Sequence, residues 1–64
     1  MRTTDQQFQG MFFAKLAREE LARGAVWMAE MTARLALAAD QKNREYEELV
    51  AMTAAARRAA TGEG

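Results

Sequence analysis

The chain has 64 residues, nine of them basic and nine acidic, and it contains no histidine, cysteine, proline or serine. These absences exclude disulfides and remove the usual general base, the commonest transition-metal ligands and most catalytic nucleophiles. A chain of this length forms at most one domain and buries only about 60% of the surface that it exposes when unfolded. Because neither a disulfide nor a histidine- or cysteine-bound metal can reinforce so small a core, we expect association with another chain to do so.

Apolar residues make up 50% of the chain, but nearly half of them are alanine. Alanine is the strongest helix former, yet its methyl group buries little area. The composition therefore predicts a helical protein with too few large apolar side chains for a stable monomer core but enough for one subunit of an assembly.

The first predicted helix covers about residues 4–22. Two overlapping capping boxes open it, in which Thr3 pairs with Gln6 and Thr4 pairs with Gln7. Such boxes satisfy backbone N–H groups that have no partner inside the helix. We therefore expect the helix to begin at these threonines.

An apolar stripe at a spacing of three and four residues follows within this helix. The stripe consists of Phe8, Met11, Phe12 and Leu16. Gly10 lies inside the same helix, where it predicts a close approach by a neighbouring backbone. Phe13 points away from the stripe and predicts a second contact surface.

A second apolar stripe lies on the opposite side if the helix continues unbroken. It contains Leu21, Met28, Met31 and Leu35. A bend at Gly24 is the simpler arrangement, since glycine commonly follows the last residue of a helix. We therefore predict a second helix over about residues 25–39.

Charged residues near these stripes are spaced as helical ion pairs. Glu19 precedes Arg23 by four residues, and Glu30 precedes Arg34 by four, which is the favourable orientation. We therefore expect both pairs to lie on solvent-exposed helix faces.

From Leu21 onward, small and apolar residues recur at alternating steps of four and three, which is the spacing of a coiled coil. This seam consists of Leu21, Ala25, Met28, Thr32, Leu35, Ala39, Lys42, Tyr46, Leu49, Thr53, Ala56 and Ala60. Residues 40–45 contain no apolar side chain. They form either a turn, in which Asp40 or Asn43 caps a new helix, or an exposed part of one long helix.

These patterns predict an all-α fold with two possible architectures. The favoured one is a small three-helix bundle or an open helical array. Its helices cover about residues 4–22, 25–39 and 42–60. In the alternative, a short helix meets one long helix in a coiled-coil-like hairpin. In both, residues 1–61 form a single helical domain and residues 62–64 a C-terminal tail.

Carboxylates are the only candidates for catalysis. Glu19 and Glu20 are adjacent, as are Glu47 and Glu48, and adjacent helical side chains point about 100° apart. Neither pair can converge on one substrate atom, so both are expected at the solvated surface. The Glu-x-x-His, calcium-loop and phosphate-loop patterns are also missing. We therefore predict no enzymatic activity, metal site, cofactor or small-molecule substrate.

The two apolar stripes together exceed what one small core can bury, and exposed stripes of this kind mark protein interfaces. The candidate interface residues are Phe8, Met11, Phe12, Phe13, Leu16, Trp27, Met28, Met31 and Leu35. Trp27 and Phe13 are the best anchors because they are large, and methionine suits an irregular surface. In the alternative interpretation, most of these side chains simply form the core.

We therefore predict a non-enzymatic protein–protein interaction protein, either a homo-oligomer or a small accessory or structural subunit of a larger assembly. A small nucleic-acid-associated regulator is the first alternative, with Arg57 and Arg58 against phosphates, but the basic excess of such proteins is missing. An amphipathic membrane-surface binder is the second, with the phenylalanines in the lipid interface, but its polar side is poor in lysine.

The first ten residues are polar apart from Met1 and Phe8, which does not resemble a secretory signal. Glu30 and Arg34 interrupt the longest apolar segment, over residues 25–39, which is too short to span a membrane. We therefore expect a cytoplasmic protein. Its alanine and arginine usage is typical of a GC-rich bacterial or phage genome.

Overall fold

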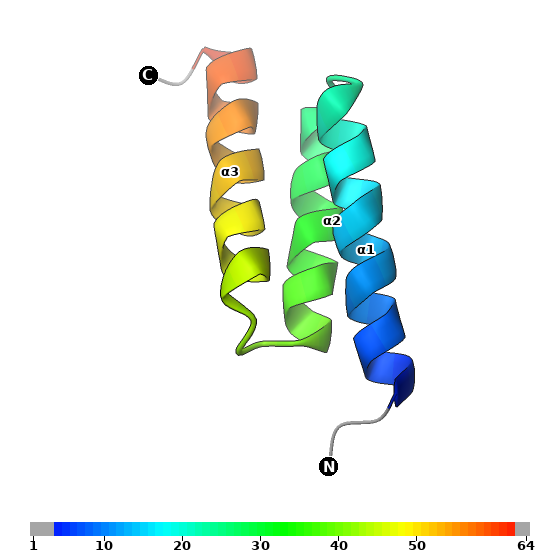
Figure 1. Ribbon diagram of the computed structural model, residues 1–64. Coiled ribbons are helices and arrows are strands. Elements are labelled where there is room, and N and C mark those ends of the chain that lie inside the picture. The colour runs from blue at the N-terminus through cyan, green and yellow to red at the C-terminus, as the bar shows by residue number, and fades with distance from the viewer. Residues whose placement is uncertain (1–3, 63–64) are drawn as a thin grey trace.

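The computed structural model describes residues 4–62, without the side chain of Thr4, and this part contains three α-helices and no strand (Figure 1). Helix α1 spans Thr4–Ala22, α2 spans Val26–Ala39 and α3 spans Arg44–Thr61. The predicted all-α, three-helix architecture is therefore confirmed, and the alternative with one long helix is wrong. The capping boxes predicted for Thr3 and for the Thr4 side chain lie outside what the structure describes.

The turn between α1 and α2 is built on Gly24, as the sequence predicts. Gly24 has a φ of 86°, a left-handed conformation that glycine adopts without steric cost. Its N–H donates to the Leu21 carbonyl at 3.0 Å, and the Ala25 N–H donates to the Glu20 carbonyl at 2.8 Å. This pair of bonds is a Schellman motif, which ends α1 and reverses the chain.

The turn between α2 and α3 is made by side-chain capping, since it contains neither glycine nor proline. Asn43 is the N-cap of α3, and its side-chain oxygen accepts a hydrogen bond from the Tyr46 N–H at 3.3 Å. The Asn43 N–H donates to the Asp40 carbonyl at 3.1 Å, which closes the turn. The carboxylates of Glu45 and Glu47 lie in the first turn of α3, where they interact favourably with the positive end of the helix dipole. The polar stretch is therefore a turn, and Asn43 is its cap.

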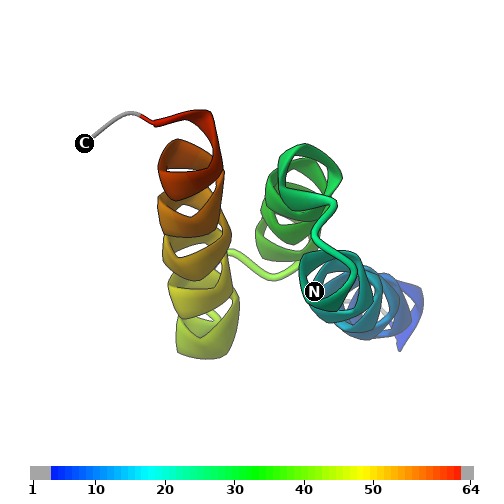
Figure 2. The ribbon, with the colours of Figure 1, turned by 90° about the horizontal axis from the view of Figure 1, so that it is seen from above.

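The three helices run up, down and up, with α2 between α1 and α3 (Figure 1). Figure 2 shows them along a shallow arc, and α1 and α3 make few contacts with each other. The molecule is therefore an open helical array, in which α2 has its two helical neighbours on its inner side.

The core is built mainly from small residues. It consists of Ala14, Ala17, Ala33, Ala36, Tyr46 and Leu49. Alanines three residues apart on α1 meet alanines three residues apart on α2, so the two helices can lie close together. A Cβ atom on Gly10 would lie 3.1 Å from Tyr46 Cε2 and 3.7 Å from the Ala36 carbonyl oxygen. The close approach at Gly10 is therefore made by the Tyr46 ring, whereas the predicted approach by a neighbouring backbone is only an ordinary contact with Ala36.

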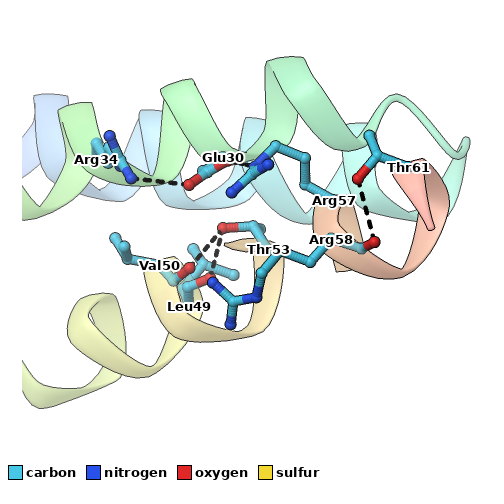
Figure 3. Close-up of polar contacts among 8 residues, drawn as sticks. All are labelled: Glu30, Arg34, Leu49, Val50, Thr53, Arg57, Arg58 and Thr61. Carbon is cyan, nitrogen blue, oxygen red and sulfur yellow. Dashed lines mark hydrogen bonds and ion pairs between the residues drawn. The ribbon is translucent and has the colours of Figure 1, made fainter. Parts of the chain in front are cut away.

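The predicted coiled-coil seam is correct along α3 and wrong along much of α2. Tyr46, Leu49 and Thr53 are buried, and the Thr53 hydroxyl donates to carbonyls of its own helix, as Figure 3 shows. On α2, in contrast, Met28 and Leu35 are more than half exposed. The reason is that α2 packs against two neighbours, and its small residues allow a closer approach than its large ones.

Candidate protein interface

The outward side of α2 carries four large apolar side chains, which we call the α2 outer face. Its members are Trp27, Met28, Met31 and Leu35. They are exposed by 57%, 56%, 68% and 51%, respectively. Their spacing of three and four residues places them within one arc of the helix. The opposite arc is buried and contains Ala29, Ala33 and Ala36. Helix α2 is therefore apolar on both sides, with its larger residues in solvent.

Helix α1 carries a second apolar surface, the α1 outer patch, made of Phe8, Met11 and Phe12. Each of these side chains is about 60% exposed. The Phe12 ring lies 5.5 Å from the Phe13 ring in an edge-to-face arrangement, and Phe13 packs against the core. Phe12 therefore lies at the boundary between the core and the exposed patch.

The nine predicted interface residues are thus divided by the structure. Seven are exposed in the α2 outer face and the α1 outer patch, whereas Phe13 and Leu16 are partly buried. The prediction that Phe13 points to a separate contact surface is not supported, because the side chain packs on the core of this chain. The alternative that most of these side chains form the core concerned six of them. Leu16 is partly buried, but the other five are exposed, namely Phe12, Trp27, Met28, Met31 and Leu35.

Met52 on α3 is a further exposed apolar residue, at 54%, which the sequence pattern did not single out. A shallow groove of about 260 Å³ lies beside it and is lined by Arg18, Glu45, Glu48, Leu49 and Met52. Arg18 and Glu45 approach within 3.9 Å across this groove, from α1 and α3. The sequence did offer one sign of this exposure. Position 52 directly precedes the seam residue Thr53 and lies outside the predicted seam, so its side chain was not expected to be buried there.

A polar network of Glu30, Arg34 and Arg57 joins α2 to α3 (Figure 3). Trp27, at one edge of the α2 outer face, lies against this network. Glu30 accepts hydrogen bonds from Arg57 Nε and, at 2.8 Å, from Arg34 Nη2. The Arg57 guanidinium lies 4.8 Å from the centre of the Trp27 ring, within cation–π range. Because Glu30 fixes Arg57, it also fixes the surface on which the indole rests.

The prediction of a solvent-exposed Glu30–Arg34 pair is therefore half wrong. The pair forms, and the Arg34 side chain is 66% exposed, but that of Glu30 is only 8% exposed. Glu30 lies at the junction of α2 and α3, where Arg57 compensates its charge. Arg57 is 27 residues away in the chain, so helical spacing could not reveal this partner.

Glu20 is also buried, at 3% exposure, although it was predicted to lie on the solvated surface with Glu19. Its Oε1 atom has no hydrogen-bond partner. A buried polar atom in that state costs about 1–3 kcal/mol. The residue sits at the end of α1, where the Schellman turn brings the start of α2 beside it. The burial of Glu20 thus follows from the turn.

Within residues 4–62, no three acidic side chains lie close enough together to hold a metal ion. None of the three helices in that range is both long and apolar enough to cross a bilayer. The chain matches no family model, no curated protein and no solved structure. The exposed apolar surface therefore remains the feature of this chain from which a function can be argued.

Proposed function

We propose that the protein acts by protein–protein association, burying the α2 outer face and the α1 outer patch against another protein chain, and that it performs no chemistry of its own. The observation that carries this proposal is the placement of side chains by size. The core is mostly alanine, while seven large apolar side chains of α1 and α2 stay more than half exposed. Monomeric soluble proteins rarely leave large contiguous apolar patches uncovered.

The energetic comparison supports association. Full burial of a side chain of this size contributes about 1.5–3 kcal/mol, so the seven half-exposed ones could still contribute on the order of 8 kcal/mol. The core of a domain below about 70 residues rarely supplies more than about 3–5 kcal/mol. Before the entropy costs of association, the exposed apolar area is thus large relative to the stability that so small a core provides.

Charge argues for a protein partner over nucleic acid. The chain has equal numbers of basic and acidic residues, whereas phosphate binding depends on a basic excess. Arg57, one of the two arginines considered for phosphate contact, is paired with the buried carboxylate of Glu30. Among the described residues, seven basic and five acidic side chains are exposed, an excess of two that attracts an anionic backbone only weakly.

A membrane-surface binder is the second candidate, because Phe8, Met11 and Phe12 are exposed together near the start of α1. Their helix also carries Asp5 and Glu19 among its exposed residues. The exposed Lys15 and Arg18 of the same helix only balance these carboxylates, so the helix lacks the basic excess that anionic lipid attracts, and we rank this function below protein association. Co-sedimentation with anionic and neutral phospholipid vesicles distinguishes the two, since a protein interface gives no vesicle-dependent pelleting.

The proposal is tested by photo-crosslinking in the cells that produce the protein. The photoreactive amino acid p-benzoylphenylalanine is placed at position 31, in the centre of the α2 outer face. The matched control places it at position 52, which is also a half-exposed methionine in the middle of a helix. We expect a discrete protein adduct from position 31 and none from position 52. Equal labelling at both positions, or no adduct at position 31, would overturn the proposal.

A further inference from the structure

We infer that the partner of the α2 outer face is a second copy of this chain, joined face to face about a two-fold axis that passes close to Met31. This inference rests on the proposed function and names its partner. Three properties of the described residues support it: the uncovered outward side of α2, the area of its apolar surface and the distribution of charge.

The layer of helices is incomplete as a domain. Protein domains consist of at least two packed layers around one core, because an apolar face has to be covered by another element. In the described part of this chain, no helix covers the outward side of α2, which exposes large apolar residues. A second copy placed against that side supplies the missing layer and creates a core between the two α2 helices.

The apolar area fits a dimer of ordinary size. A large apolar or aromatic side chain presents about 150–250 Å² when fully exposed. At the observed exposures, the four residues of the α2 outer face offer roughly 450 Å² per chain by that measure, which is about the apolar share of an interface of ordinary size. Stable interfaces bury about 800 Å² per partner, including a polar rim. The face and its rim therefore suffice for a dimer without any contribution from a larger partner.

The charge distribution permits the face to meet its own copy. In a two-fold interface, residues near the axis contact the same residues of the partner, so a charge placed there would be repelled. The centre of the α2 outer face is Met31, which is uncharged and the most exposed residue of the set at 68%. The nearest carboxylate, Glu30, is turned to α3 and paired with Arg57. The nearest exposed cation, Arg34, lies beside the face and is paired with the same carboxylate at 2.8 Å, so it belongs to the polar rim.

The net charge of the whole chain also permits two copies to associate. It is zero, so no long-range repulsion opposes dimerisation. Methionine also adapts its side chain to a neighbour of the same kind. The outward side of α2 is therefore suited to pack against itself.

A cysteine pair tests this geometry directly, because the chain contains no cysteine of its own. Met31→Cys would bring two thiols together across the axis, at the separation of about 3.5–4.5 Å between Cβ atoms that a disulfide needs. The matched control is Met52→Cys. Under mild oxidation at low micromolar concentration, we expect Met31→Cys to form a disulfide-linked dimer at least tenfold faster than Met52→Cys. Equal rates for the two variants would overturn the inference.

Sedimentation of the unmodified chain provides the second measurement. We expect a species of twice the chain mass that dissociates on dilution. Met31→Lys should weaken the dimer at least tenfold and Met52→Lys less than twofold. A monomer at every concentration up to about 100 μM, or equal weakening by both substitutions, would contradict a dimer through this face.

The two proposals fail differently. A monomeric chain that still forms an adduct with a different protein from position 31 in cells overturns only the identity of the partner. A monomeric chain that forms no adduct from position 31 overturns the proposed function as well.

Discussion

The two sides of α2 differ in a way that reverses the usual amphipathic helix. The inner side, against α1 and α3, is lined by Ala29, Ala33 and Ala36, which are completely buried. The outer side presents Trp27 and Met31, which are more than half exposed. Ordinary surface helices bury their large apolar residues and expose polar ones. The difference indicates that short-range helix packing within the chain is achieved with methyl groups, while the larger side chains remain available for association.

The two helix–helix contacts of α2 differ as well. The contact with α1 is made by alanines and depends on close approach, whereas the contact with α3 includes the buried pair of Glu30 and Arg57. Adding volume to close alanine packing lowers the stability of the fold, and so does removing one partner of a buried ion pair. The following substitutions separate these sources of stability from the association surface.

Glu30→Ala should have the largest effect on folding. It leaves the largely buried Arg57 guanidinium without its carboxylate, so we expect a loss of about 3 kcal/mol in the free energy of unfolding, measured by urea titration of the circular dichroism at 222 nm. Glu19→Ala is the matched control, because that glutamate is exposed, and it should change stability by less than about 0.5 kcal/mol. Equal effects of the two substitutions would mean that the Glu30–Arg57 pair does not hold α3 in place.

Ala33→Leu should lower the free energy of unfolding by about 2–3 kcal/mol, because the added volume has no space on the inner side of α2. Ala51→Leu makes the same change at an exposed position of α3, outside the proposed interface, and should be nearly neutral in the same urea titration. If Ala33→Leu were tolerated as well as Ala51→Leu, the close alanine packing would not describe the molecule in solution.

Trp27→Ala should weaken association by about 2 kcal/mol, or roughly thirtyfold, while changing the helix content of the isolated chain much less. The physical reason is that the indole is 57% exposed and rests on Arg57 at one edge, so little of the chain's own core depends on it. Sedimentation measures the first quantity and circular dichroism the second. Unfolding of a stable monomer by this substitution would show instead that Trp27 belongs to the core.

Glu20→Met should produce the smallest change and the only gain. Replacing a buried carboxylate that has an unpartnered oxygen by an apolar side chain of similar length removes a desolvation cost, so we expect about 1 kcal/mol of added stability. A thermal melt compared with that of Glu19→Met is the appropriate measurement. A loss of stability specific to Glu20→Met would indicate that this carboxylate contributes favourably to the turn between α1 and α2.

Local features of the sequence determined the secondary structure of this protein. Alanine-rich composition specifies helix, Gly24 ends the first one through a left-handed residue, and Asn43 begins the third through its side chain. Each of these effects acts within about five residues and is therefore visible in the sequence itself. The predicted exposure of large apolar side chains also followed from composition, since a chain with two opposed stripes cannot bury both.

Only the tertiary structure decided which side of α2 faces inward and which charges are buried. A seam prediction assumes that the larger residues of a repeat pack inside, but two neighbouring helices approach α2 most closely along its alanines. The burial of Glu30 depends on Arg57, which belongs to another helix. Both outcomes result from contacts between distant segments, and their energies depend on how the helices fit together rather than on the spacing of residues along one of them.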